Sequence, residues 1–300
     1  MQMAEIKGVI PAILTPMNED ESINYDELRR QANRLIDAGV HGLFPFGTNG
    51  EAYILSEAEK MEILKVIVDE VGGRVPVYAG TGCIGTKDTI EQSNKAKDLG
   101  ADILSIISPS FAKASQNELY EHFKAVAEGV DMPIVLYNIP ARTGNVITPE
   151  TVEKLSEIPN IVGVKDSSGN FDNMLQYIER TRHVEGFSVL SGNDSLILWN
   201  LMAGGTGGIA GCANIYPATM ASIYDLYVAG ELETARKVQD SIRSLRNTFK
   251  YGNPNTIVKA AVELLGYPVG KCRAPFNQVP DQGIEALKKV LEENAALGMS

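Results

Sequence analysis

The stretch IVGVKDSSG, residues 161–169, brings a short apolar run directly to a lysine, Lys165. An apolar run without strict polar alternation is typical of a parallel strand that is covered on both faces. Similar runs recur along the chain, at residues 8–16, 41–48, 75–82, 101–109, 132–138, 160–166, 186–192 and 205–211. The recurrence predicts a parallel sheet in which residues 160–166 form one of eight strands.

Helical patterns separate these runs. The segments at 24–40, 56–72, 86–100 and 115–130 have apolar residues at helical spacing, and Ser56 with Glu59 forms a capping-box pattern. Eight alternating strand and helix units predict an α/β protein with a (β/α)8 barrel. A doubly wound parallel sheet is the alternative, and the number of units does not exclude it.

The carboxyl-terminal part of the chain has a different pattern. Beyond about residue 212 the strand-like runs stop, and residues 216–249, 254–266 and 281–298 are helical in pattern. We therefore expect residues 1–228 to form the barrel that carries the active site. Residues 229–300 are expected to form a helical extension, the first long helical stretch supplying the last helix of the barrel.

Composition narrows the class of protein. The 300 residues are 44% hydrophobic and 22% charged, with a net charge of −11. This charge argues against a nucleic acid or an anionic membrane as partner. Three scattered cysteines without a CxxC pair indicate reduced thiols. No secretory signal pattern and no apolar run of about 18 residues occurs, so we expect a cytoplasmic protein.

One glycine-rich motif matches the pattern of a nucleotide site, but the acidic residue that should follow it on the next strand is absent. GTGCIG, residues 80–85, matches the dinucleotide-binding pattern, yet the next strand-like run ends in Ser and Pro rather than in an acidic residue. We interpret the motif as a tight turn between a strand and a helix. The three histidines are isolated and form no zinc-binding pattern, so neither a metal nor a nucleotide cofactor is expected.

The expected ends of the strands carry the polar residues from which an active site can be built, since barrel enzymes act at that face. These residues are Thr15, Thr48, Asn49, Glu51, Thr81, Ser108, Tyr137, Asn138, Arg142, Lys165, Asp166, Ser191, Asn193 and Asp194. Among them, only Lys165 is a candidate nitrogen nucleophile. Strand alternation places it on the same face as Gly163, which we expect to leave space beneath it. A lysine amine kept partly dry can attack a carbonyl carbon.

The neighbouring run adds two functional groups. Tyr137 carries a phenol that can relay protons, and Arg142 can hold a carboxylate with two parallel hydrogen bonds. Each of the three residues also has a plainer explanation: a solvated strand end for Lys165, a packed aromatic for Tyr137 and a surface ion pair for Arg142. Together they indicate a pocket for an α-keto acid.

Three motifs then show a resemblance that covers nearly the whole chain. GTNGE (47–51), YNIPARTG (137–144) and GVKDSSGN (163–170) resemble the family of dihydrodipicolinate synthase and N-acetylneuraminate lyase, which are class I pyruvate-dependent aldolases. The similarity extends from residue 8 to CRAPFNQV (272–279). It implies a barrel fold, Schiff-base chemistry without a separate cofactor, and a homotetramer built as a dimer of dimers.

The resemblance also implies roles for individual residues. Lys165 would form the imine with pyruvate, and Tyr137 with Thr48 would shuttle protons. Thr48 and the backbone of Asn49 would hold the pyruvate carboxylate, and Arg142 would hold the carboxylate of the second substrate. Backbone groups of two further residues, Gly192 and Ile209, would line the pocket.

Within the family, several positions bear on the substrate. Arg142 favours the synthase branch, which joins pyruvate to aspartate semialdehyde in lysine and diaminopimelate biosynthesis. Phe111, however, stands where that branch has a tyrosine reaching the neighbouring subunit, and Ile84 and Ser110 stand at positions that bind feedback lysine in some members. A 2-keto-3-deoxy sugar acid aldolase or dehydratase is therefore an alternative.

Two further functions are compatible with the sequence. An N-acetylneuraminate lyase-like aldolase is one of them, although Asp194 is followed by Ser195 rather than Glu, which fits that branch less well. A non-catalytic barrel that binds a keto acid is the other, from a different class of protein, and the presence of Lys165 and Tyr137 argues against it.

Overall fold

The computed structural model describes residues 6–300, which divide into two compact units. The first unit comprises residues 76–209 with Ile6 and Lys7, and the second comprises residues 8–75 and 210–300. These are units of close packing, and the predicted division between barrel and extension at residue 228 stays a prediction.

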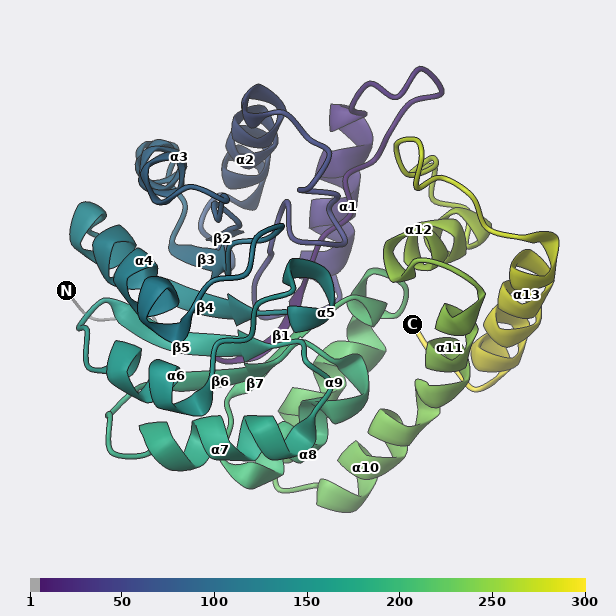
Figure 1. Ribbon diagram of the computed structural model, residues 1–300. Helices are drawn as coiled ribbons and strands as arrows, with labels where there is room; N and C mark the ends of the chain where they lie inside the picture. The colour runs from purple at the N-terminus through teal and green to yellow at the C-terminus, as the bar shows by residue number, and fades with distance from the viewer. Residues whose placement is uncertain (1–5) are drawn as a thin grey trace. The chain divides into compact units, whose positions relative to one another are not determined.

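The first unit is a parallel sheet flanked by helices (Figure 1). Each strand pairs in parallel with the next along the chain, as consecutive strand–helix units require. The strands are β2 Tyr78–Ala79, β3 Ile103–Ile107, β4 Ile134–Asn138, β5 Ile161–Asp166, β6 Ser188–Ser191 and β7 Gly207–Ala210, the last ending one residue into the second unit. The helices are α3 Thr86–Asp98, α4 Gln116–Gly129, α5 Pro140–Thr143, α6 Pro149–Ser156, α7 Phe171–Thr181, η1 Asp194–Leu196 and α8 Ile197–Ala203.

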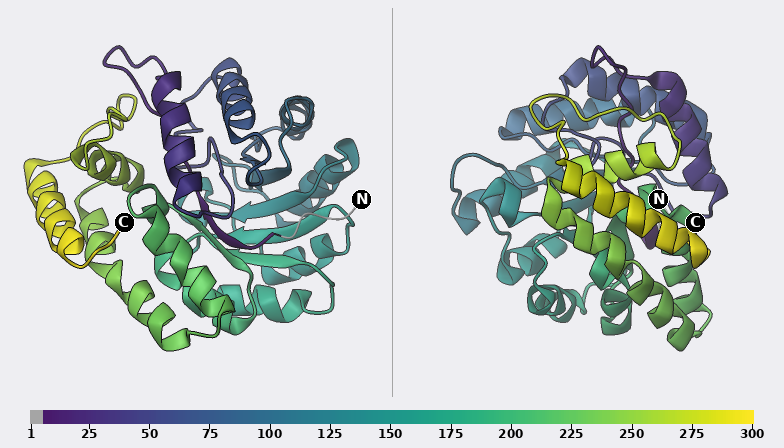
Figure 2. Two further views of the ribbon diagram at one scale, coloured as in Figure 1. Left: turned by 180° about the vertical axis from the view of Figure 1, so that it is seen from behind. Right: turned by 90° about the vertical axis from the view of Figure 1, so that its right-hand side faces the viewer.

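The second unit contains one strand and the remaining helices among the described residues. They are β1 Gly8–Pro11, α1 Tyr25–Asp37, α2 Glu57–Val71, η2 Cys212–Asn214, α9 Pro217–Val228, α10 Leu232–Ser241, α11 Arg243–Asn247, η3 Thr248–Tyr251, α12 Pro254–Leu264 and α13 Asp281–Ala296. Helix α13 packs on α11 and α12 (Figure 2).

Local sequence signals explain where several helices begin and end. The capping box at α2 is confirmed: the Glu59 amide donates to Ser56 Oγ at 3.3 Å, and the Ser56 amide donates to Glu59 Oε2 at 2.8 Å. The helical stretch predicted at 216–249 is divided rather than continuous. Gly230, with a φ of 81°, follows the end of α9 and allows the chain to turn into α10.

The strand predicted at residues 41–48 is shorter than predicted. The His41 amide donates to the Val9 carbonyl at 3.0 Å, and the Phe44 amide donates to Pro11 at 2.9 Å, so the segment begins as a parallel partner of β1. Phe46 then has a φ of 39°, and the chain turns away over GTNG. A left-handed residue cannot continue a strand, which explains why the segment stops.

Candidate active site

The carboxyl ends of β4 and β5 bring Tyr137 and Lys165 side by side. The two residues are direct register partners in the parallel ladder. Lys165 Nζ lies 3.8 Å from the centre of the Tyr137 ring. Each residue is only 4% exposed. Lys165 is therefore a buried amine on an aromatic ring and not a solvated strand end.

Two glycines shape the surroundings of this amine. A Cβ atom at Gly192 would lie 3.0 Å from Lys165 Cε and 1.9 Å from Ser167 Oγ, so only glycine leaves room for the lysine side chain. The expectation for Gly163 needs correction. A Cβ there would meet the Ser188 carbonyl oxygen at 2.6 Å, so the glycine permits the close approach of β6.

Asp166, the residue after the lysine, serves as an anchor for the loops. It is fully buried, and its carboxylate accepts hydrogen bonds from Asn138 Nδ2 at 2.8 Å and Ser168 Oγ at 2.8 Å. Asn173 Nδ2 adds a third at 3.2 Å. Since these donors occupy both carboxylate oxygens, Asp166 fixes the ends of β4 and β5 and the start of α7 around the lysine.

The other expected residues of the first unit lie on neighbouring elements. Arg142 is exposed on the short helix α5, where its amide donates to the Ile139 carbonyl at 3.0 Å. Ile209 is buried in β7, which pairs with β6, the strand that leads to Gly192. The structure thus brings Lys165, Tyr137 and Gly192 into one cluster, with Arg142 on the helix that follows β4.

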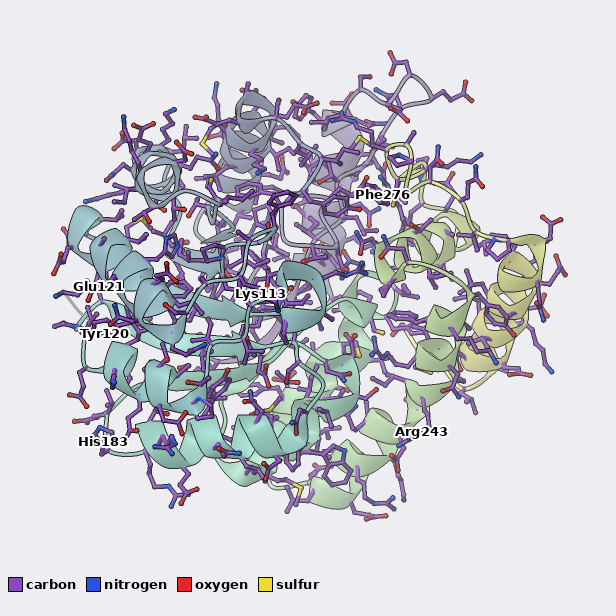
Figure 3. All side chains as sticks on the ribbon, viewed as in Figure 1. Lys113, Tyr120, Glu121, His183, Arg243 and Phe276 are labelled. Atoms are coloured by element: carbon purple, nitrogen blue, oxygen red, sulfur yellow. The ribbon has the colours of Figure 1, made fainter. Side chains whose placement is uncertain are left out.

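The loop after β3 is held in an unusual conformation. Phe111 is 99% exposed and has a φ of 76°, which is rare for a residue with a side chain. Asn145 Nδ2 holds the loop by donating to the carbonyls of Pro109 at 2.9 Å and Ala112 at 2.8 Å. Lys113, labelled in Figure 3, donates from Nζ to the Gly144 carbonyl. The loop is therefore fastened to the segment after α5, while the Phe111 side chain is left in solvent.

The GTGCIG motif is a turn, as predicted. The Cys83 amide donates to Thr89 Oγ1 at 3.0 Å, and that hydroxyl donates to the Gly85 carbonyl at 2.9 Å. A Cβ at Gly82 would lie 2.7 Å from the Ile107 amide nitrogen, so this glycine allows close packing on β3. Ile84, on the same turn, is 63% exposed.

Thr48 and Asn49 belong to the second unit and lie in a compact turn, residues 47–51. The Glu51 amide donates to the Thr48 carbonyl at 3.1 Å, which closes the turn. Within residues 6–300, the backbone amides of Asn49 and Gly50 donate to no acceptor. Two adjacent amides without acceptors are a suitable arrangement for holding an anionic oxygen.

Sequence reasoning missed a buried ion pair that supports this turn. Lys259 Nζ donates to Glu51 Oε1 at 2.8 Å, and the two side chains are 1% and 0% exposed. The available signal was a lysine within the apolar pattern of α12, where Ile257, Val258, Ala261 and Val262 are all buried. A charged residue at a buried helix position requires a partner.

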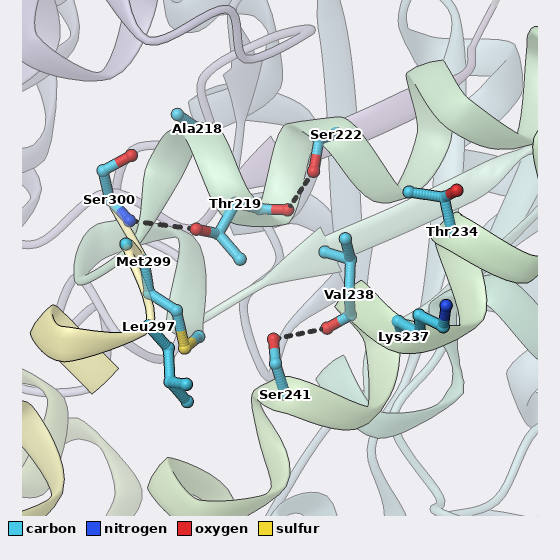
Figure 4. Close-up of a pocket in the computed structure, with 11 residues that line it drawn as sticks. Ala218, Thr219, Ser222, Thr234, Lys237, Val238, Ser241, Leu297, Met299 and Ser300 are labelled. Carbon is cyan, nitrogen blue, oxygen red and sulfur yellow. Dashed lines mark hydrogen bonds between the residues drawn. The ribbon is translucent and has the colours of Figure 1, made fainter. Parts of the chain in front are cut away.

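The rest of the described structure contains weaker candidates for a functional site. A cavity beside α9 and α10 is lined by Thr219, Ser222, Lys237, Ser241 and residues 297–300 (Figure 4). Two of its hydroxyls donate to backbone groups of the chain: Ser222 Oγ to the Thr219 carbonyl and Ser241 Oγ to the Val238 carbonyl. Across residues 6–300, no group of three or more His, Cys, Asp or Glu side chains is placed to hold a metal ion.

None of the helices in the described part of the chain is both long and apolar enough to cross a lipid bilayer.

Comparison with known proteins identifies the family. The model of the dihydrodipicolinate synthetase family matches residues 5–294. The chain belongs to this family. A relative from Methanospirillum hungatei, named 4-hydroxy-tetrahydrodipicolinate synthase, is 41% identical over 95% of this chain and 98% of its own. A relative of the same name from Methanopyrus kandleri is 42% identical, covering 96% of each chain.

The fold is that of the solved synthases. The crystal structure of dihydrodipicolinate synthase from Thermotoga maritima superposes with a TM-score of 0.94 and 31% identity, over 97% of this chain and 99% of that one. The predicted (β/α)8 barrel with a carboxyl-terminal helical extension is confirmed, and the doubly wound sheet is excluded. The prediction of an enzyme of the class I lyase type is confirmed by membership of the dihydrodipicolinate synthetase family.

Proposed function

We propose that the protein is a 4-hydroxy-tetrahydrodipicolinate synthase that condenses pyruvate with aspartate 4-semialdehyde. This reaction belongs to lysine and diaminopimelate biosynthesis. The observation that carries the proposal is the buried Lys165 amine held 3.8 Å from the centre of the Tyr137 ring. An amine that is shielded from water beside a phenol suits the formation of an imine with a keto acid.

The chemistry follows from these two side chains. The neutral Lys165 amine attacks the carbonyl carbon of pyruvate, and the carbonyl oxygen leaves as water after it has accepted protons. The resulting imine withdraws electrons, so a methyl proton is lost and an enamine forms. The enamine carbon then attacks the aldehyde of the second substrate. Tyr137 would carry protons to and from the reacting atoms. The imine is the electron sink, so the reaction as proposed needs no metal or other cofactor.

The remaining expected residues would orient the substrates. We assign the pyruvate carboxylate to Thr48 and to the backbone of Asn49, because two adjacent amides of the 47–51 turn have no acceptor among the described residues 6–300. Arg142 would hold the carboxylate of aspartate semialdehyde, which its exposure leaves accessible. Gly192 and Ile209 would line the pocket with backbone groups.

A second activity is favoured by one observation, the identity of residue 111. Phe111 is exposed at a position where the synthase branch carries a tyrosine, and a phenyl ring cannot relay a proton. The second candidate is accordingly an aldolase or dehydratase for a 2-keto-3-deoxy sugar acid, which uses the same pyruvate imine. An N-acetylneuraminate lyase-like aldolase and a non-catalytic keto-acid-binding barrel are the weaker candidates.

A substrate panel separates these activities. Purified protein is supplied with pyruvate and aspartate semialdehyde in one arm, and with 2-keto-3-deoxygluconate or N-acetylneuraminate in the others. We expect turnover in the first arm, measured as consumption of the semialdehyde. Cleavage of a sugar acid with no consumption of the semialdehyde would contradict the synthase assignment, and no turnover in any arm would favour a binding protein.

Assembly, regulation and location are part of the same proposal. We propose a homotetramer that acts in the cytoplasm on small keto acid and aldehyde substrates, without nucleic acid or membrane partners. The net charge of −11 supports the absence of polyanionic partners. Feedback by lysine is not expected, because Ile84 and Ser110 stand at the positions that bind lysine in some family members.

A further inference from the structure

The buried pair of Lys259 and Glu51 joins helix α12 to the 47–51 turn. Glu51 Oε1 accepts from Lys259 Nζ at 2.8 Å, and Glu51 Oε2 accepts from the Arg273 amide at 2.8 Å. Lys259 Nζ also donates to the Thr15 carbonyl at 2.7 Å. Both carboxylate oxygens accept a hydrogen bond, and the ammonium donates two, so each charge of the buried pair has partners.

Helix α12 also reaches the turn through a second residue. Asn255, one helical turn before Lys259, donates from Nδ2 to the Thr48 carbonyl at 2.9 Å and to Tyr53 Oη at 2.9 Å. Asn255 is 1% exposed, so these bonds form out of contact with water. Spacing of four residues places both side chains on the same face of the helix. One face of α12 therefore holds the turn at Thr48 and at Glu51.

The backbone of the turn shows why it needs to be held. Glu51 has a φ of 61°, a left-handed conformation that is unfavourable for a residue with a side chain. Glycine at this position would relieve the strain but would lose both bonds of the carboxylate. Strained residues persist where surrounding contacts over-determine them, and they cluster at functional sites.

Packing restrains the turn from another direction. A Cβ at Gly211 would lie 2.5 Å from Asn49 Nδ2, so the backbone that follows β7 lies directly against the Asn49 side chain. Thr15 Oγ1 donates to the Gly50 carbonyl at 2.7 Å. With α12 on Thr48 and Glu51, every residue from 48 to 51 is fixed by a contact from outside the turn.

We propose that α12 positions the 47–51 turn for substrate, with Asn255 and Lys259 as positioning residues that act through Thr48 and Asn49. The inference rests on the proposed function, in which this turn holds the carboxylate of pyruvate. A carboxylate held by the backbone of the turn is held equally before and during the reaction, and neither variant removes the Thr48 hydroxyl that was assigned to proton transfer. A misplaced turn therefore weakens pyruvate binding more than it slows the chemical step. The expected signature is a raised KM for pyruvate with little change in kcat.

The test uses the full-length enzyme and two variants. Asn255→Ala removes the tether to Thr48 without creating a buried charge. Lys259→Met leaves the Glu51 carboxylate buried and unpaired, so it is combined with Glu51→Gln to restore neutrality and protect the fold. The matched control is Thr256→Val on the same helix, which removes a hydrogen bond to the Phe276 carbonyl, a residue labelled in Figure 3, and leaves the bonds to the turn in place.

The readouts are kcat, the KM for pyruvate and the pyruvate concentration that gives half-maximal borohydride-trapped imine. We expect Asn255→Ala and the double variant to raise the KM and the half-maximal concentration about tenfold, with kcat within about threefold of wild type. The Thr256→Val variant should match wild type in all three. Melting temperatures show which variants are folded at the assay temperature.

The outcomes separate this inference from the proposed function. If wild type traps no imine with pyruvate, the proposed function fails. If wild type traps imine and folded Asn255→Ala requires the same pyruvate concentration, α12 is not a positioning element and this inference alone is overturned. A fall in kcat without a rise in KM would also overturn it, since it would place the defect outside pyruvate binding.

Discussion

Lys165 and Tyr137 are register partners on adjacent parallel strands, and the lysine Nζ lies 3.8 Å from the centre of the tyrosine ring. The ladder between β4 and β5 therefore sets the position of the amine relative to the phenol. Because both residues are buried on rigid strands, this placement requires no loop to close. The expected effects of substitution follow from this pair and from the contacts around it.

Replacement of Tyr137 by Phe tests the hydroxyl separately from the ring. Tyr137→Phe keeps the aromatic face beside Lys165 Nζ but removes the proton relay. We expect kcat to fall by about 10² to 10⁴, the range for a lost general acid or base, with a melting temperature close to wild type. Steady-state kinetics and thermal melts measure both. An unchanged kcat would show that the proton follows another route.

Gly192→Ala tests the space that the lysine occupies. The added methyl group would overlap Ser167 Oγ and press on Lys165 Cε, which would move the amine. We expect kcat/KM to fall by at least about tenfold, because small displacements of a reacting group are costly. The control is Gly252→Ala. The backbone there is extended, with a φ of 178°, and the added Cβ would lie 3.4 Å from its nearest neighbour, Ile257 Cδ1. Equal activity of the two variants would contradict the assignment.

Acid stability depends on Arg273 and Glu59. The Arg273 guanidinium, with the cap at Ser56, lowers the pKa of Glu59 to about 2. A lowered folded-state pKa stabilises the protein above about pH 4.5, and this contribution is lost as the pH falls toward 2. Arg273→Leu should remove about 2 kcal/mol of unfolding free energy at pH 7 and much less at pH 2.5.

Denaturant titrations at both pH values measure the effect of Arg273→Leu. Lys288→Leu is the control, because its ion pair with Glu285 is exposed and should contribute little. A loss at pH 2.5 as large as that at pH 7 would mean that Arg273 acts through packing rather than through the charge of Glu59.

Burial of His122 should make the stability of the protein depend on pH in a second, higher pH range. The ring is 6% exposed, and burial lowers its pKa. Its Nδ1 lies 2.9 Å from Thr86 Oγ1, while Nε2 has no hydrogen-bond partner within residues 6–300. Below about pH 6.5 the unfolded chain binds a proton that the folded ring resists, so stability falls as the pH falls through this range.

His122→Asn should make the stability of the protein less dependent on pH between about 6.5 and 5, because asparagine does not titrate. The measurement is the difference in unfolding free energy between wild type and variant at several pH values. A difference that stays constant across the range would show that unfolding does not change the proton binding of His122.

Sequence patterns predicted most of the fold because its units are local. The apolar runs and the capping box at Ser56 are readable within a few residues, and the cap is present, as is a second box of the same form at Ser115. The strand at 41–48 was overextended, because the left-handed turn at Phe46 is not evident from an apolar composition. Division of the 216–249 segment was signalled by Gly230 but not recognised.

Some residues of the candidate site could be predicted from the sequence and others could not, because they depend on contacts of different sequence separation. Lys165 and Tyr137 follow directly from strand ends, where the order of strands decides which side chains meet, whereas Gly192 was expected only from the family resemblance. The Lys259–Glu51 pair joins residues 208 positions apart, and no local pattern reports a contact of that separation. In such a case the sequence shows only that a lysine lies on a face of a helix that should be buried, and it does not identify the partner.

The central claim is that Lys165 is the nucleophile, and covalent trapping tests it most directly. The protein is incubated with pyruvate, reduced with borohydride, digested and examined by mass spectrometry. We predict that a peptide containing Lys165 gains the mass of pyruvate less one water plus two hydrogens, and that Lys165→Ala shows no such gain. A wild-type protein without an adduct, or an adduct on another lysine, would contradict the account.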